Sequence, residues 1–287
     1  MAQLKESELK KQIKEKAFVP LYFLYGEEKY LISHYTEAIV NKVLGKSYSD
    51  FNFQAFDGGK ASIDEIADAA QALPLFAERK CVLVKDLNVE ALNAGELAKL
   101  YQLLEELSET TVLIISQSTL EIDAKRSAKW KKFIAAAEKN GTVVLLEKRG
   151  EIALEKQLVQ WAEKRGCGLT QINAGKIIQL CGDDLLTLSS ELEKLCAYAV
   201  GREITKDDID LLVTKNLETT VFVLGSALMA GNYDKAYQQL DLLFYQKEEP
   251  VAVLAVLSSN YVNLYRAKTA LESGTAKIGR ASCRERV

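Results

Sequence analysis

The stretch Pro20-Leu21-Tyr22-Phe23-Leu24-Tyr25-Gly26 is short, apolar and aromatic, and it ends at a glycine. A run of this length and composition, closed by a turn residue, is typical of a buried strand. Apolar residues then recur at helical spacing over 29–44. The chain is therefore predicted to open its fold with a strand, a tight turn and a helix.

The same alternation continues outward from this unit to about residue 149. Further strands are predicted over 51–56, 80–84, 111–115 and 142–146, with helices over 95–107 and 124–139. Another helix should follow Ser62, because Ser62 and Glu65 have the spacing of a capping box. Strands that alternate with helices predict a mainly parallel sheet, since parallel strands require crossover connections.

Every segment beyond Arg149 has the pattern of a helix. The first group is predicted over 151–165, from a cap at Asn173 to Gly182, from a cap at Asp183 or Asp184 to Val200, and after a capping box formed by Thr205 and Asp208. A second group is predicted over 220–230, 233–245 and 250–272. We therefore expect an α/β domain over 1–149 and two all-α domains over 150–213 and 214–277.

Composition excludes several classes of protein. The chain has 287 residues, of which 27% are charged, and no apolar run reaches the ~20 residues that cross a bilayer. The charged N-terminus lacks the apolar core of a signal peptide, so a cytoplasmic protein without membrane contact is expected. His34 is the only histidine and the five cysteines form no CxxC pair, so neither a metal site nor any other cofactor is expected. The formal net charge of -3 argues against binding DNA over the whole surface.

The last ten residues, 278–287, differ from the rest of the chain. Their sequence, IGRASCRERV, looks like the translation of a common short-read sequencing adaptor rather than a protein segment. A genuine basic tail is the alternative interpretation. We expect the segment to take no part in the fold and the last helical domain to be truncated.

The turn after the first strand occupies the place of the phosphate-binding loop in nucleotide-binding α/β proteins. In the frame G-x-x-x-x-G-K-[ST], Gly26 and Ser33 match, but Leu31 replaces the second glycine and Ile32 replaces the lysine. Leucine does not readily let the backbone wrap a phosphate, and isoleucine carries no charge for the terminal phosphates. The loop is therefore predicted not to bind ATP, and Asp86 after the third strand is interpreted as a turn residue.

Four stretches, 19–31, 51–58, 71–87 and 190–199, resemble the delta subunits of bacterial DNA polymerase III. The resemblance implies an AAA+-like α/β domain without a working ATP site, a small lid-like helical domain and a helical collar. It also implies a subunit without catalysis of its own in a DNA-directed DNA polymerase (nucleotidyltransferase) holoenzyme. Such a clamp-loader subunit binds the sliding clamp (the beta subunit) and helps to open it for loading onto primed DNA during replication. The other implied partners are the gamma/tau and delta-prime subunits, and primed DNA through the complex.

The family's clamp contact maps onto Leu75 and Phe76 in the segment Gln71-Ala72-Leu73-Pro74-Leu75-Phe76. An apolar pair suits a hydrophobic pocket, and burying each side chain contributes ~1.5–3 kcal/mol. Leu73 is a weaker candidate. The alternative interpretation is that these residues belong to the core at a helix-to-strand turn.

The most basic stretch covers residues 125–132. Lys125, Arg126, Lys129, Lys131 and Lys132 surround Trp130 and are candidates for contact with DNA phosphates, although exposed basic helices are usually only solvated. Two other functions remain open from the residues alone: an active AAA+ ATPase, and a helical adaptor protein unrelated to replication.

Overall fold

The computed structural model describes residues 4–45, 51–123 and 126–272. The chain divides into two compact units, residues 1–148 and 149–287, and each is described by itself. The adaptor-like segment 278–287 lies outside the described residues.

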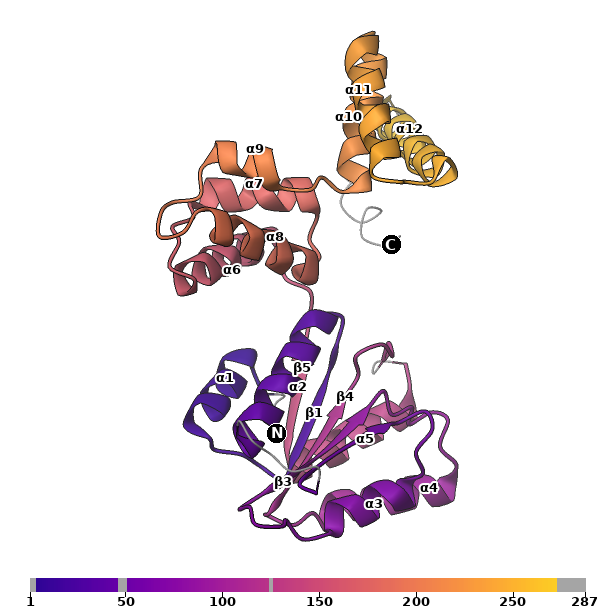
Figure 1. The fold of residues 1–287 in the computed structure, drawn as a ribbon. Coiled ribbons are helices and arrows are strands. Elements are labelled where there is room, and N and C mark those ends of the chain that lie inside the picture. Colours follow the sequence, from indigo (N-terminus) through magenta and orange to yellow (C-terminus); the bar gives the residue numbers. More distant parts are fainter. Residues whose placement is uncertain (1–3, 46–50, 124–125, 273–287) are drawn as a thin grey trace. The chain divides into compact units, whose positions relative to one another are not determined.

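The first unit contains a five-stranded parallel sheet in the order β2-β3-β4-β1-β5, which confirms the predicted parallel arrangement (Figure 1). Its strands are β1 (Leu21–Gly26), β2 (Phe53–Asp57), β3 (Lys80–Lys85), β4 (Thr111–Ser116) and β5 (Thr142–Leu146). The opening strand thus lies between β4 and β5, and its first five residues are buried.

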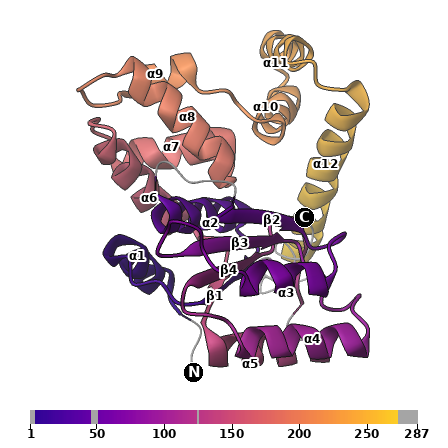
Figure 2. The same ribbon diagram turned by 60° about the horizontal axis from the view of Figure 1, so that its bottom comes forward.

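Helices cover both faces of this sheet. They are α1 (Glu6–Glu15), α2 (Lys29–Leu44), α3 (Ile63–Gln71), α4 (Ala94–Glu105) and α5 (Ala128–Asn140). Figure 2 shows α2 on one face and α3, α4 and α5 on the other. The predicted capping box is confirmed, because Ser62 accepts from the backbone of Glu65 while Glu65 accepts from that of Ser62.

Helix α1 was not predicted. Its sequence, ESELKKQIKE, presents only Leu9 and Ile13 to the interior, so the apolar signal is two residues at i and i+4 in a charged segment. Its partners are α2, the next helix along the chain, and β5, which is distant in the sequence. Tertiary packing, rather than local pattern, therefore accounts for this helix.

One hydrophobic core of the first unit lies between the sheet and helices α3, α4 and α5, and buried residues of α2 pack on the sheet as well. Phe23 on β1 stacks on Trp130 of α5 at 6.2 Å between ring centroids and meets Phe133 edge-on at 5.0 Å. All three aromatic side chains are buried. The aromatic opening strand is thus the centre of the packing that orders this unit.

The second unit is entirely helical among its described residues, apart from one isolated bridge between Gly168 and Glu203. Its helices are α6 (Glu151–Lys164), α7 (Gln171–Cys181), α8 (Leu185–Tyr198), α9 (Lys206–Leu212), α10 (Leu217–Met229), α11 (Tyr233–Tyr245) and α12 (Pro250–Glu272). Helices α10, α11 and α12 share a small core of their own, formed around Val221 and Leu243. The division of the helical part between residues 213 and 214 stays a prediction.

Three predicted helix ends in this unit were wrong. Thr170, not Asn173, caps α7, since its hydroxyl accepts from the backbone of Asn173, whose own side chain donates to Ile204 at 2.9 Å. Helix α8 ends at Tyr198 rather than Val200, and α10 begins at Leu217 because Asn216 caps it. Thr170 and Asn216 precede the predicted starts of α7 and α10 and supply the capping side chains, whereas the two-residue difference at the end of α8 is within the usual variation of helix ends.

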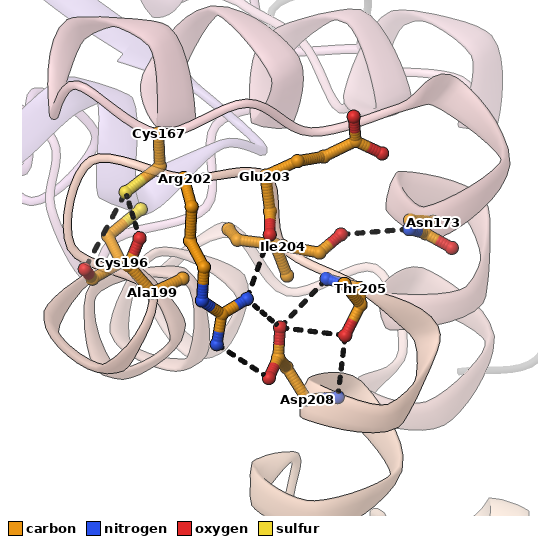
Figure 3. A network of polar contacts seen from close by, with 9 residues as sticks. All are labelled: Cys167, Asn173, Cys196, Ala199, Arg202, Glu203, Ile204, Thr205 and Asp208. Atoms are coloured by element: carbon orange, nitrogen blue, oxygen red, sulfur yellow. Dashed lines mark hydrogen bonds and ion pairs between the residues drawn. The ribbon is translucent and has the colours of Figure 1, made fainter.

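The turn before α9 is held by a network of polar contacts (Figure 3). The carboxylate of Asp208 accepts two hydrogen bonds from the guanidinium of Arg202, at 2.6 and 2.9 Å, and forms the predicted capping box with Thr205. The Cys167 thiol donates to the backbone carbonyl groups of Cys196 and Ala199. This network ties the end of α8 to the start of α9.

No single helix of the described residues is long and apolar enough to cross a membrane, and α9 and α10 would suffice only as a pair bent by 98°.

Candidate functional site

The turn between β1 and α2 is closed against the sheet. Gly26 has a φ of +138°, and a Cβ atom there would lie 2.1 Å from the carbonyl oxygen of Leu146 on β5. The backbone N–H of Glu28 donates to that same oxygen at 3.0 Å. Helix α2 then begins at Lys29, so the second half of the phosphate-loop frame is already helical. A helix in this place leaves no open loop of N–H groups to surround a phosphate.

The two replaced residues of that frame belong to the core. Leu31 is 3% exposed and Ile32 is fully buried, whereas Ser33 lies exposed on the next turn of the helix. The side chains that stand in for glycine and lysine thus stabilise the packing of α2 on the sheet.

Polar side chains around this turn form hydrogen bonds with other parts of the same unit. The ammonium group of Lys29 donates to the carbonyl oxygens of Gln117 and Leu120, at 3.1 and 2.7 Å. Burial lowers the pKa of Lys29, while the charges of Asp86 and Glu121 oppose that effect.

Asp86 holds the segment that follows β4. It has a φ of +57°, and its carboxylate accepts hydrogen bonds from the backbone of Thr119 at 2.7 Å, the backbone of Leu120 at 3.1 Å and the hydroxyl of Ser118 at 2.9 Å. Burial favours the protonated acid, but these hydrogen bonds outweigh it and lower the pKa of Asp86. The interpretation of Asp86 as a turn residue agrees with these contacts.

The segment between α3 and β3 exposes its apolar side chains. Leu73 is 77% exposed, Leu75 is 49% exposed and Phe76 is fully exposed. The alternative interpretation, that these residues are core at a helix-to-strand turn, does not hold for this structure. An exposed apolar group of this kind marks a surface available to a partner.

The backbone of this segment is nevertheless fixed. The side-chain amide of Asn52 donates to the carbonyl oxygen of Leu75 at 2.7 Å and accepts from its N–H at 2.8 Å. Sequence reasoning missed Asn52, which precedes β2 and lies 23 residues away along the chain. No local motif signals such a pairing, because only the sheet brings the two segments together.

The basic stretch is largely engaged in other contacts. Lys129 donates to the carbonyl oxygens of Glu90 and Leu92, both at 2.8 Å, and Lys132 lies 5.0 Å from the ring centroid of Tyr101. Arg126 pairs with Asp123 at 3.4 Å. Lys131 is exposed, and Lys125 lies outside the described residues.

Trp130 lies within this basic stretch but does not share its exposure. The indole is 2% exposed and packs on Phe23, so it is a core residue and offers no surface on which a base could stack. The remaining cations are candidates only for contact with phosphates.

The part of the chain that the structure describes holds no group of side chains suited to a metal ion. No cluster of three or more His, Cys, Asp or Glu side chains occurs there. His34 lies exposed between aromatic neighbours, stacked on Tyr30 at 6.1 Å and edge-on to Tyr35 at 5.3 Å.

Together, these features define a class of protein: an AAA+-like α/β unit whose phosphate loop is closed by core residues, followed by a series of helices. Comparison with known families then gives the relationship. Residues 22–146 match the family model described as DNA polymerase III, delta subunit, and residues 218–281 match the model for the C-terminal domain of the same family. The chain belongs to the family of DNA polymerase III delta subunits. The second match overlaps the first four residues of the adaptor-like segment.

Curated relatives and a solved structure agree with this assignment. The chain is 25% identical to the DNA polymerase III subunit delta of Bacillus subtilis, over 92% of this chain and 77% of that protein. It is 24% identical to the corresponding delta protein of Escherichia coli, over 93% and 76% of the two chains. The fold is similar to that of the Bacillus subtilis DNA clamp loader delta protein, with a TM-score of 0.68, 24% identity, and coverage of 93% of this chain and 80% of that one.

Proposed function

We propose that this chain is the subunit of a clamp loader that binds the sliding clamp and helps to open it during DNA replication. The observation that carries the proposal is the exposed pair Leu75 and Phe76, on a loop whose backbone is held in place. Family resemblance assigns the clamp contact to these two positions, and Leu73 extends the same exposed surface.

The proposed mechanism is differential binding. A protein opens a ring only if it binds the open form more tightly than the closed form. Leu75 and Phe76 would fill a pocket beside a clamp interface and hold a neighbouring clamp element in a position that misfits the closed ring. This step requires no ATP at this subunit, which agrees with the closed turn between β1 and α2.

We further propose that the subunit has no catalytic activity of its own. It joins the polymerase holoenzyme by assembling with the gamma/tau and delta-prime subunits. It contacts primed DNA only as part of that complex. A cytoplasmic location follows from this role and stays a prediction.

Helices α10, α11 and α12 are the proposed surface for those partner subunits. They form an apolar groove of about 500 Å³ lined by residues that include Tyr237, Phe244 and Leu254, all substantially exposed. Replacing Tyr237 and Leu254 with serine should prevent co-elution with the partners in size-exclusion chromatography while clamp binding persists. Normal assembly of that variant would contradict the placement of the partner surface.

The test of the function itself is a binding assay with purified clamp. Immobilised clamp should retain the full chain in the absence of nucleotide and of other subunits. An adaptor unrelated to replication would not be retained, and an active ATPase would require nucleotide. Failure of the clamp to retain the folded chain would therefore overturn the proposal.

A further inference from the structure

The side chain of Asn52 forms two hydrogen bonds with the backbone of Leu75, in the exposed loop between α3 and β3. Its amide nitrogen donates to the carbonyl oxygen of Leu75 at 2.7 Å, and its amide oxygen accepts from the N–H of Leu75 at 2.8 Å. Asn52 itself is only 5% exposed, so solvent does not compete freely for these two bonds. Both backbone groups of one loop residue are thus satisfied by one side chain.

The sheet fixes the position of Asn52. Its own carbonyl oxygen accepts from the N–H of Cys81 on β3 at 2.8 Å, and the next residue along the chain, Phe53, begins β2. The bonds from Asn52 to Leu75 therefore fix the loop to the edge of the sheet rather than to another loop.

Both flanks of the loop are held in the same manner, through backbone carbonyl groups. The Thr111 hydroxyl donates to Ala70 at 2.8 Å, and the buried Lys80 ammonium donates to Ala69, so the last turn of α3 is fixed. The Arg79 guanidinium donates to Phe18 at 3.0 Å on the other side. None of these contacts uses an apolar side chain of the loop.

The loop also contains a residue in an unfavourable conformation. Phe76 has a φ of +53°, a left-handed backbone that residues other than glycine rarely adopt. An exposed loop free to relax would leave this conformation, because the phenylalanine ring gains no burial from it. The anchored neighbour, Leu75, is the element that opposes this relaxation.

We propose that Asn52 is a positioning residue for clamp binding, which holds Leu75 and Phe76 in the conformation that enters the clamp. This inference rests on the proposed function. The affinity of a ligand falls in proportion to the population of the competent conformation, so loosening the loop weakens binding although both contact side chains remain. Loss of two hydrogen bonds of about 1 kcal/mol each corresponds to a decrease in affinity of about 10–100-fold.

Asparagine is the residue that this geometry requires. The loop residue presents one donor and one acceptor, and the short side-chain amide supplies the complementary acceptor and donor on two separate atoms. Aspartate would keep the bond from the Leu75 N–H but place a charge against its carbonyl oxygen. Leucine has the same number and branching of side-chain heavy atoms and makes neither bond.

The first test uses the unaltered chain. In native-state hydrogen exchange the amide of Leu75 should be strongly protected relative to that of Phe76, although both residues lie in an exposed loop. Exchange of the Leu75 amide at the rate of an unstructured peptide would overturn the proposal.

The second test measures clamp affinity and thermal stability for Asn52→Leu, Asn52→Asp and a matched control, Asn93→Ala. Asn93 caps α4 in the same unit and does not contact the loop, so its replacement lowers the melting temperature without loosening Leu75. We expect the Asn52 variants to lose about 10–100-fold in affinity and Asn93→Ala to bind like wild type. Folded Asn52→Leu or Asn52→Asp protein with wild-type affinity would contradict the assignment.

Comparison with Leu75→Ala/Phe76→Ala distinguishes the clamp contact itself from the positioning role of Asn52. If that double variant binds the clamp normally, the proposed function fails. If it loses binding while the Asn52 variants retain it, the proposed function stands and the positioning role fails. Adding Asn52→Leu to the double variant should cause no further loss, because the side chains that it positions are then absent.

Discussion

The ammonium group of Lys29 donates a hydrogen bond to the carbonyl oxygen of Leu120 at 2.7 Å. Leu120 also donates its N–H to Asp86, so one segment after β4 receives both a cation from α2 and a carboxylate from the end of β3. A basic and an acidic group near a phosphate loop are the groups that would meet a nucleotide and its metal ion. In this protein Lys29 and Asp86 instead form hydrogen bonds with the backbone of the segment that follows β4.

We expect the isolated chain neither to bind nor to hydrolyse ATP. The first turn of α2 occupies the space of a phosphate loop, and Ile32 is fully buried where a lysine would be needed. Calorimetric titration with Mg-ATP should show no binding at low micromolar concentration, and phosphate release should equal the buffer rate. Hydrolysis by the pure protein that Ser33→Ala abolishes would disprove this.

Replacement of both Leu75 and Phe76 by alanine should cost ~3–6 kcal/mol of clamp binding if both side chains are fully buried there. The melting temperature should stay near that of wild type, because the two side chains are exposed in the free chain. Ile172→Ala is a suitable control, since Ile172 is an 85% exposed apolar residue in the other unit. A large fall in melting temperature with intact affinity would place the pair in the core.

The sequence predicted β1, β3, β4 and β5 because these strands are largely buried and read as continuous apolar runs, as Val112 to Ile115 illustrates. Prediction from the sequence failed where contacts between separate elements determine whether a helix forms or a side chain is buried. Helix α1 depends on packing against α2 and β5, and Trp130 joins the core through Phe23 on another element.

The candidate site, too, could be predicted only in part from the sequence. Leu75 and Phe76 were found through resemblance, and their exposure required the structure. Asn52 could not be found from the sequence, because an asparagine before a strand is an ordinary turn residue until its partner is known.

Buried thiols should be unreactive in the native protein. Burial raises the pKa of Cys81 and of Cys181 to about 12, and that of Cys196 to about 11. The thiolate is the reactive form, so at pH 8 a disulfide reagent should modify these cysteines only after unfolding.

The thiol measurement is best made on a Cys283→Ser variant, because Cys283 lies outside the described residues. Four thiols, those of Cys81, Cys167, Cys181 and Cys196, should then appear in denaturant. Rapid modification of any of the three with raised pKa values in native buffer would contradict their burial.

Acid should weaken the contact between Arg202 and Asp208. Hydrogen bonds from the Arg202 guanidinium, and then from the backbone of Thr205, hold the pKa of Asp208 well below its ordinary value of 3.8. A carboxylate with a depressed pKa in the folded state contributes stability that is fully present above the unfolded-state value and is lost as the pH falls below it. The melting temperature of wild type should therefore exceed that of Asp208→Asn most at pH 7, and the difference should shrink below about pH 4. Asp207→Asn, in the same turn but exposed, should show no such convergence. A difference between wild type and Asp208→Asn that stays constant from neutral pH into acid would mean that the ion pair does not stabilise the start of α9.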